Sequence, residues 1–187
     1  MEHQFGGGLL VLVEGDITLI AADAIGNAAN AALAGGGGVD GAIHRVGGPA
    51  IIAELRARHP YGTPAGTAVS TSAGHLPARW VIHAVGPVWQ GGDHGESVQL
   101  AGAYLSVLSV AAELGARTLT LPAISAGAYG YPLEDAARIA GGTVAESLRA
   151  GAPLERVTFV LYSPRPLAVF ELVGGHLVPF SIVAPPS

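Results

Sequence analysis

The 187-residue sequence contains no cysteine and no lysine, and all nine of its basic residues are arginine. The absence of cysteine excludes disulfide bonds and thiolate metal ligands, and it fits a cytoplasmic protein. The absence of lysine excludes a lysine nucleophile, a lysine Schiff base and the lysine of a P-loop. Neither cysteine-based nor lysine-based catalysis is therefore available to this chain.

Charge and long apolar runs are scarce as well. Only 12% of the residues are charged and the formal net charge is −5, so no nucleic-acid partner is expected, because such partners are bound through basic surfaces. No apolar stretch without a charged residue reaches the about 20 residues that a transmembrane helix needs. The apolar run from Leu9 to Val13 is too short for a signal peptide. We therefore expect neither a membrane segment nor a signal peptide.

Apolar residues, by contrast, make up 50% of the sequence, and its length suits one domain. Short apolar runs predict strands at 9–13, 24–26, 67–72, 80–85, 118–121 and 156–162. Helical spacing and proline positions predict helices at 39–46, 50–58, 97–114, 132–148 and 166–173. Strands that alternate with helices predict an α/β fold, a three-layer sandwich with a largely parallel sheet. For the apolar tail 174–187 two readings stay open, an edge strand and partial disorder.

The most distinctive motif is a run of four glycines, Gly35 to Gly38. Glycine permits a close approach to the backbone, and free N–H groups at a helix start can hold a phosphate. The run contains the spacing G-x-G-x-x-G, but it does not directly follow a strand and no Gly-Lys-Ser/Thr comes after it. Rossmann and P-loop sites are therefore disfavoured. An anion-binding loop and a flexible hinge loop remain as readings.

A second loop of small residues runs from Ser125 to Gly130, between an expected strand and an expected helix. Ligands of α/β sheets bind at the carboxyl ends of the strands. The two loops are therefore expected to face one crevice and to grip two phosphates from opposite sides. Ser125 is not interpreted as a nucleophile, because it lacks the Gly-x-Ser-x-Gly setting.

Asp40 is the strongest candidate for a catalytic residue. In its ordinary reading it is the N-cap of the helix 39–46. A site built only for phosphate would avoid a carboxylate, so we expect Asp40 to meet a neutral ribose hydroxyl or a water. Nearby anions would raise its pKa and make it a better base. His44 lies four residues further, on the same helical face, and is expected to support Asp40.

Four other polar residues carry weaker signals. One of Asn27 and Asn30 is expected to hold the loop through backbone hydrogen bonds, while the other faces the ligand. Asp16 ends the first strand, as an N-cap or turn residue or as the acceptor of a base amino group. His83 lies in an apolar strand and is interpreted as a satisfied core histidine. The seven histidines show no metal-ligand spacing, so neither a metal nor a cofactor is expected.

Five stretches together resemble the macrodomain family of ADP-ribose-binding modules, and most of all its MacroD-type ADP-ribosylhydrolases. In family order they are 15–18, 24–30, 35–44, 76–83 with 85–89, and 121–132. The resemblance implies a single macrodomain over 1–187, with its core at about 8–173 and a tail at 174–187. It also implies a mixed sheet of six strands between helices, with ADP-ribose across its crest. Gly26 departs from the family, which usually has valine or isoleucine there.

The resemblance assigns the ligand-binding residues as follows. Asp16 would bind the adenine amino group, with Ile17 as its backbone-contacting neighbour and Tyr162 beside the adenine. One phosphate loop would be formed by Gly37, Gly38 and Val39, with Asn27 and His44 as further residues of the ligand site. The other phosphate loop would be formed by Ser125, Ala126, Gly127, Ala128 and Tyr129, the last of which packs against the distal ribose.

Asn30 and Asp40 are the implied catalytic pair. Asn30 would orient the distal ribose, and Asp40 would position or activate a water. The implied activity removes mono-ADP-ribose from acidic side chains of proteins and hydrolyses O-acetyl-ADP-ribose, because both substrates present an ester on that ribose. A pure ADP-ribose reader is the alternative, and it would not need this pair. The expected partners are ADP-ribose, O-acetyl-ADP-ribose and mono-ADP-ribosylated proteins, bound by a cytoplasmic bacterial monomer.

Overall fold

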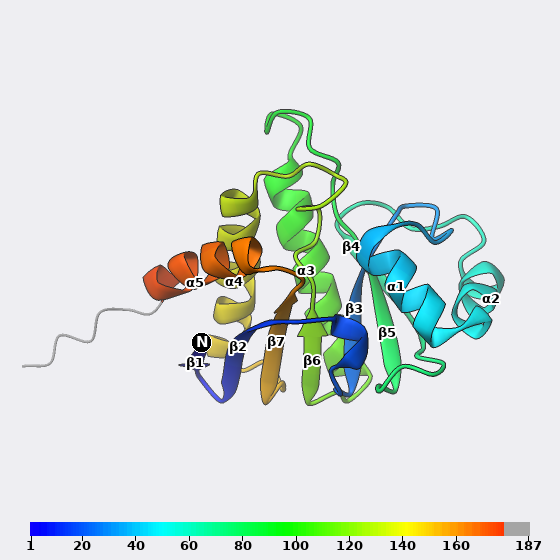
Figure 1. Cartoon of the computed structure of the whole chain (residues 1–187), viewed down its shortest axis with the longest axis horizontal. Coiled ribbons are helices and arrows are strands. Elements are labelled where there is room, and N and C mark those ends of the chain that lie inside the picture. The colour runs from blue at the N-terminus through cyan, green and yellow to red at the C-terminus, as the bar shows by residue number, and fades with distance from the viewer. Residues whose placement is uncertain (178–187) are drawn as a thin grey trace, which may run out of the picture.

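A computed structural model describes residues 1–177, which form a seven-stranded sheet of order β1-β2-β7-β6-β3-β5-β4 (Figure 1). The strands are β1 (Glu2–Phe5), β2 (Gly8–Glu14), β3 (Ala24–Ala29), β4 (Thr67–Ser72), β5 (Trp80–Val85), β6 (Thr118–Leu121) and β7 (Arg156–Leu161). The strands from β2 to β5 in this order are parallel, and β1 and β4 are antiparallel edge strands. The carboxyl ends of the parallel strands therefore meet at one edge of the sheet.

Helices cover both faces of the sheet. On one face lie α1 (Gly38–Gly47) and α2 (Pro49–Arg58), together with the short 3₁₀ helix η1 (Ile17–Leu19). On the other face lie α3 (Glu96–Glu113), α4 (Leu133–Arg149) and α5 (Pro164–Leu177). Because side chains alternate along a strand, Ile25 packs into the α1–α2 core while its neighbour Ala24 packs into the other. The predicted three-layer α/β class is confirmed.

The sheet has one strand more than the six that were expected, and the additional strand is β1. Its first three residues are polar and not buried, so no apolar alternation marks it in the sequence. Phe5 is buried, and β1 pairs with β2 from Glu2↔Val11 to Phe5↔Gly8. An edge strand draws its backbone hydrogen bonds from a single neighbour, and here that neighbour compensates for a weak local pattern.

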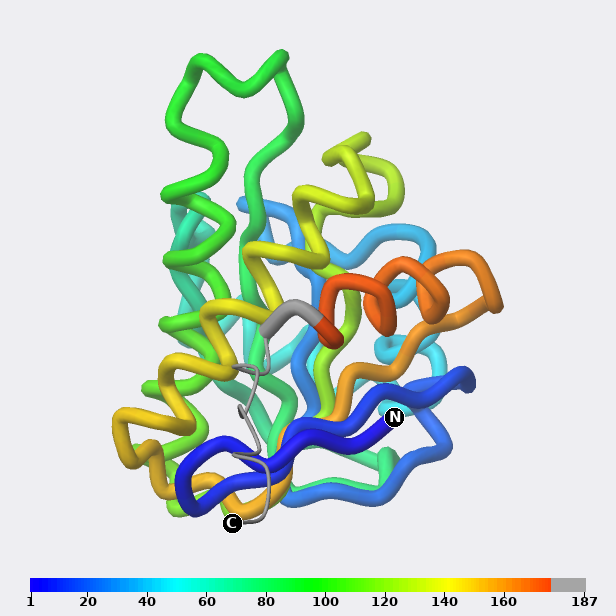
Figure 2. Tube along the Cα trace, turned by 90° about the vertical axis from the view of Figure 1, so that its left-hand side faces the viewer, coloured from blue at the N-terminus to red at the C-terminus, as the bar shows by residue number. Residues whose placement is uncertain are grey.

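Helix α5 is longer than the predicted 166–173 and includes residues 174–177. Residues 178–187, the rest of the tail on which the sequence left two readings open, lie outside the described part of the chain. The loop between β5 and α3, residues 86–95, extends furthest above the carboxyl edge of the sheet in both views (Figure 2).

Within residues 1–177, no helix combines the length and the apolar character that crossing a bilayer demands.

Candidate functional site

The predicted site residues fall in a row along the carboxyl edge of the sheet. Asp16 follows β2, Tyr162 follows β7, the loop 122–131 follows β6, and Asn30 follows β3. These strands are consecutive in the sheet, so three strand spacings, about 14 Å, separate the β2 end from the β3 end. Sequence-distant motifs are thus arranged as one elongated site.

The glycine run forms the start of α1. Gly37 is the N-cap residue without a side-chain cap, and Gly38 has a φ of +57°, which disfavours residues with a Cβ. Within residues 1–177 the N–H groups of Gly37, Gly38 and Val39 have no hydrogen-bond acceptor. The loop therefore presents free backbone donors at the positive end of a helix dipole, as an anion site requires.

Asn30 shapes this loop from within. Its Nδ2 donates to the carbonyl oxygen of Gly35 at 2.8 Å, and its Oδ1 accepts from the N–H of Ala34 at 3.2 Å. The prediction that one of the two asparagines holds the loop is confirmed for Asn30, whereas the prediction that the other faces the ligand is wrong, because Asn27 is fully buried. The second hydrogen on Nδ2 remains available for another acceptor.

Asp40 is the third residue of α1, so the alternative that it serves only as the N-cap is excluded; Gly37 takes that place because the helix begins two residues earlier than Asp40. Asp40 is 4% exposed, and its Oδ1 accepts from Asn27 Nδ2 at 2.6 Å and lies 3.3 Å from His44 Nε2. Its Oδ2 faces Gly36, where an added Cβ would come within 3.1 Å of that oxygen. One carboxylate oxygen is thus held and the other faces the glycine loop.

Burial raises the pKa of Asp40, but the hydrogen bonds from His44 and Asn27 outweigh burial and hold the pKa below its ordinary value. These two donors favour the charged form in the protein alone, and the rise expected from nearby anions stays a prediction. Asp40 is ionised at neutral pH, and any rise caused by a bound anion has to work against its hydrogen bonds.

The second small-residue loop is also built around the backbone. Ser125 has a φ of +64° and is buried, and its Oγ would lie only 2.2 Å from a Cβ on Gly86. Within the described residues this Oγ has no hydrogen-bond partner, so no base activates it. No acceptor is found in residues 1–177 for the backbone N–H groups of Gly127, Ala128 and Tyr129. This loop can bind an anion in the same way as the glycine run.

The β2 end of the row has a different character. Asp16 caps η1, where its Oδ1 accepts from the N–H and the Oγ1 of Thr18 at 2.9 and 2.7 Å, and these bonds lower its pKa. The turn reading of Asp16 is confirmed, and its second carboxylate oxygen remains for a ligand. Ile17 is buried in the core, whereas Tyr162 is 85% exposed directly after β7. A carboxylate and an exposed aromatic ring therefore flank this end.

Residues 26–140 match the family model described as Macro domain. The chain belongs to the macrodomain family. It is 53% identical over 159 residues to a Citrobacter koseri protein named O-acetyl-ADP-ribose deacetylase, covering 84% of this chain and 90% of that protein. It is 54% identical over 165 residues to a macro domain-containing protein of Streptomyces coelicolor, covering 86% and 95%.

Solved macrodomain structures agree with this fold. The Oceanobacillus iheyensis macrodomain with ADP superposes with a TM-score of 0.90 at 36% identity, over 95% of both chains. The Trypanosoma brucei macrodomain in complex with ADP-ribose superposes with a TM-score of 0.81 at 38% identity, over 87% of this chain and 68% of that one. The macrodomain fold predicted from the five stretches is confirmed.

In this macrodomain, Asn27 has no exposed surface and lies beneath Asp40. Its Nδ2 is also 3.1 Å from Nδ1 of His83, whose Nε2 is 2.9 Å from Thr71 Oγ1. The interpretation of His83 as a satisfied core histidine is confirmed, since both ring nitrogens have partners. Sequence reasoning missed that these partners connect His83 to Asp40, because no local spacing relates β5 to α1.

Asp40, His44 and His83 have ligand atoms that all lie within 4.8 Å of one another, a grouping that could hold a metal ion. The histidine spacing in the sequence did not reveal it, since the residues come from a helix and a strand. The amide Nδ2 of Asn27 lies within hydrogen-bond distance of both Asp40 and His83. An ion would have to displace this amide, so the geometry favours a hydrogen-bonded network.

The buried carboxylate of Glu96 holds the loop 86–95, which joins β5 to α3. Glu96 accepts hydrogen bonds of 2.7 to 3.1 Å from the N–H groups of Gln90, Gly92 and His94. Burial raises the pKa of Glu96, but these backbone hydrogen bonds prevail and lower it to about 2. The N–H of Trp89 donates to the carbonyl of Tyr129 at 2.9 Å, so the loop 86–95 supports the loop 125–130.

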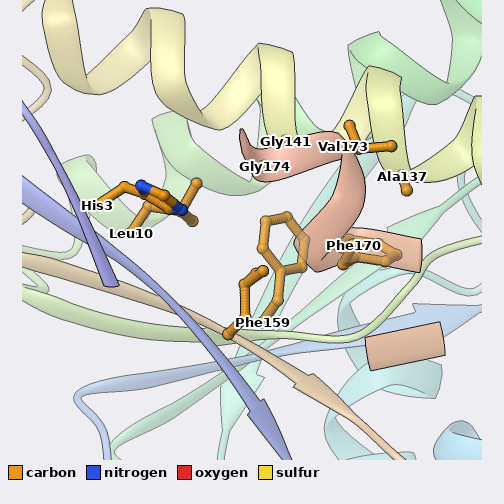
Figure 3. A pocket seen from close by; sticks show the side chains of 9 residues that line it. His3, Leu10, Ala137, Gly141, Phe159, Phe170, Val173 and Gly174 are labelled. Carbon is orange, nitrogen blue, oxygen red and sulfur yellow. The ribbon is translucent and has the colours of Figure 1, made fainter. Parts of the chain in front are cut away.

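Two cavities lie away from this row. The cavity in Figure 3, between β1, β2, α4 and α5, has about 10 Å³ and holds one water at most. A shallow depression of about 280 Å³ lies between the loop 32–34 and the end of α2. Neither cavity contains Asp40 or the free N–H groups, so the site is the open edge itself.

Proposed function

We propose that this macrodomain binds ADP-ribose along the carboxyl edge of its sheet and hydrolyses esters on the distal ribose. Its substrates would be O-acetyl-ADP-ribose and proteins that carry mono-ADP-ribose on acidic side chains. The observation that carries the proposal is Asp40, a buried and ionised carboxylate beside a phosphate cradle, with one oxygen directed at the glycine loop. A module that only bound phosphate would gain nothing from this charge, which repels the ligand.

The row of groups supports an extended ligand. The free N–H groups of the glycine run and of the loop 125–130 would hold the two phosphates. At the β2 end, Asp16 would accept the adenine amino group and Tyr162 would lie against the base. The distal ribose would then lie at the β3 end, beside Asn30 and Asp40.

The named relative and the solved macrodomain structures support the same function. The Citrobacter koseri relative is named an O-acetyl-ADP-ribose deacetylase, and the two structural neighbours described above contain ADP and ADP-ribose. Acetyl and glutamyl or aspartyl esters present the same bond at the distal ribose. One ester-cleaving site can therefore serve small-molecule and protein substrates.

In the proposed reaction, a water cleaves the ester to give a ribose hydroxyl and a carboxylic acid. Asp40 Oδ2 would accept a hydrogen bond from that water, while Oδ1 stays held by Asn27 and His44. The free hydrogen on Asn30 Nδ2 would bind a ribose hydroxyl and set its orientation. Because the pKa of Asp40 is low, it is in the accepting form throughout the neutral range.

The decisive experiment incubates the purified chain with a protein carrying glutamate-linked mono-ADP-ribose, and separately with O-acetyl-ADP-ribose. We expect loss of the protein label and release of free ADP-ribose, together with deacetylation of the small molecule. Retention of both esters, with ADP-ribose still bound, would identify a reader instead. Deacetylation without protein demodification would restrict the function to the small-molecule ester.

A further inference from the structure

We propose that Thr71 and His83 are positioning residues for Asp40, acting through the amide of Asn27; the proposal rests on the hydrolysis proposed above. Asn27, His83 and Thr71 come from the neighbouring strands β3, β5 and β4. Asn27 and His83 are direct register partners, and all three side chains lie on the face covered by α1 and α2. The chain of contacts crosses three strands and ends at the carboxylate.

The direction of each hydrogen bond in this chain follows from the donors present. The Oγ1 hydrogen of Thr71 is used on the carbonyl of Ser72 at 2.9 Å, so Oγ1 has to accept from His83 Nε2. The neutral His83 ring carries one hydrogen, so Nδ1 is then a bare acceptor. That acceptor matches the Asn27 Nδ2 group 3.1 Å away, which can only donate.

The same amide group completes the chain at Asp40. Nδ2 has two hydrogens, and the partners within reach are His83 Nδ1 and Asp40 Oδ1. The reversed amide would place its oxygen against the carboxylate, which repels it. Thr71 therefore selects the tautomer of His83, His83 selects the amide orientation of Asn27, and the amide fixes Asp40 Oδ1.

Burial makes this chain stiff. Asn27 and His83 are fully buried and Thr71 is 1% exposed, so water cannot replace a lost partner. Burial together with the nearby His44 lowers the pKa of His83 to about 3, which keeps the ring neutral at neutral pH. The His44 ring, 5.9 Å from that of His83, contacts the same Asp40 oxygen from the solvent side. Oδ2 is left with a defined direction toward the glycine loop.

The test uses two matched pairs of variants in the full chain, measured on O-acetyl-ADP-ribose. Thr71→Val keeps the shape but removes the hydroxyl, and Thr71→Ser restores the hydroxyl with less packing. His83→Asn keeps an acceptor at the δ position toward Asn27, and His83→Gln keeps only the ε position toward Thr71. A purely structural role predicts that the smaller residue of each pair is the worse one, whereas positioning predicts the reverse.

We expect Thr71→Val and His83→Gln to lower kcat by about 10- to 100-fold, with ADP-ribose affinity changed by less than about threefold. Thr71→Ser and His83→Asn should recover most of that loss. A Thr71→Val enzyme within about twofold of wild type would overturn the proposal, and so would a Thr71→Ser enzyme as slow as Thr71→Val.

Nitrogen-15 NMR of the His83 ring separates this proposal from the proposed function. The expected signature is a neutral ring with its hydrogen on Nε2, and loss of that signature in Thr71→Val. A hydrogen on Nδ1 in the wild type overturns the positioning chain, whatever the activity. An inactive wild type with the Nε2–H tautomer would instead refute the hydrolysis and leave the chain as a purely structural network.

Discussion

At the β2 end of the site, Asp16 bonds to Thr18 only two residues away, and Tyr162 is exposed. At the β3 end, Asp40 bonds to Asn27, 13 residues away, which in turn contacts His83, 56 residues further along. The first end is built locally and faces solvent, whereas the second is built from buried contacts between distant elements. Under the proposed function, the exposed end would bind the adenine, and the rigid buried end would hold the reactive carboxylate in one orientation.

The largest effect is expected where the buried network meets the ligand. Asp40→Asn keeps the shape and the acceptor for Asn27, but it removes the charge that we propose holds the reacting water. Turnover should fall by about 10²–10⁴-fold, or about 3–5 kcal/mol, while ADP-ribose still binds. Steady-state kinetics and calorimetric binding measure the two quantities. Turnover within about twofold of wild type would remove Asp40 from the chemistry.

The second-largest effect is expected on the stability of the buried β3 end when the pH is lowered. The folded pKa of His83 is about 3, below its ordinary 6.5, so the unfolded chain binds the proton more readily. The stability that neutral His83 contributes is complete above pH 6.5 and falls as the pH drops toward 3. Between pH 6.5 and 5 the loss should be about 2 kcal/mol of unfolding free energy. Denaturant titrations of wild type and His83→Asn at several pH values should show that the unfolding free energy of wild type falls more steeply with decreasing pH. An equal dependence on pH in the two proteins would contradict a buried, neutral His83.

A smaller effect should follow from closing the space beside Asp40. In Gly36→Ala the new Cβ would come within 3.1 Å of Asp40 Oδ2, whereas a Cβ at Gly37 would meet no atom within 4 Å. Gly36→Ala should lower kcat by about tenfold, because it occupies the place of the reacting group. Gly37→Ala is the matched control. Equal kcat values for the two variants would mean that the space beside Oδ2 is not used.

The smallest effect is expected at the exposed end. Asp16→Asn keeps the acceptor that caps η1 but loses the charge that we propose accepts the adenine amino group. ADP-ribose affinity should weaken by about 1 kcal/mol, or about fivefold, with kcat unchanged. Asp23→Asn is the control, because Asp23 holds the start of β6 at the opposite edge of the sheet. A change in kcat for Asp16→Asn would contradict the separation of the two ends.

Much of the fold could be predicted from local pattern. The strands 67–72, 80–85 and 118–121 have the predicted bounds, because apolar and β-branched runs are bracketed by polar or turn residues. β1 could not be predicted, since pairing with β2 rather than its own composition makes it a strand. Gly26, the departure from the family pattern, is explained only by the fold: a Cβ there would come within 2.8 Å of Leu121 Cδ2.

The candidate site divides in the same way. The glycine run and the loop 125–130 were recognisable because backbone donors at a loop are a local property of small residues. The different roles of Asn27 and Asn30 were not recognisable, since the two lie only three positions apart in the sequence but only Asn27 faces the core. The lowered pKa of Asp40 was missed because only the packing of α1 on β3 brings Asn27 to the carboxylate; the other donor, His44, lies four residues along the same helix.

From residue 8 onward, the sequence by itself determined the order of strands and helices, the two loops of small residues, and the absence of lysine and cysteine chemistry. These depend on residue type and on spacing within a few positions. Only the tertiary structure decided that Asp40 is held by Asn27, and Asn27 in turn by His83 and Thr71. The pairing of Asn27 with His83 is a matter of register between β3 and β5, and register exists only once the sheet has formed.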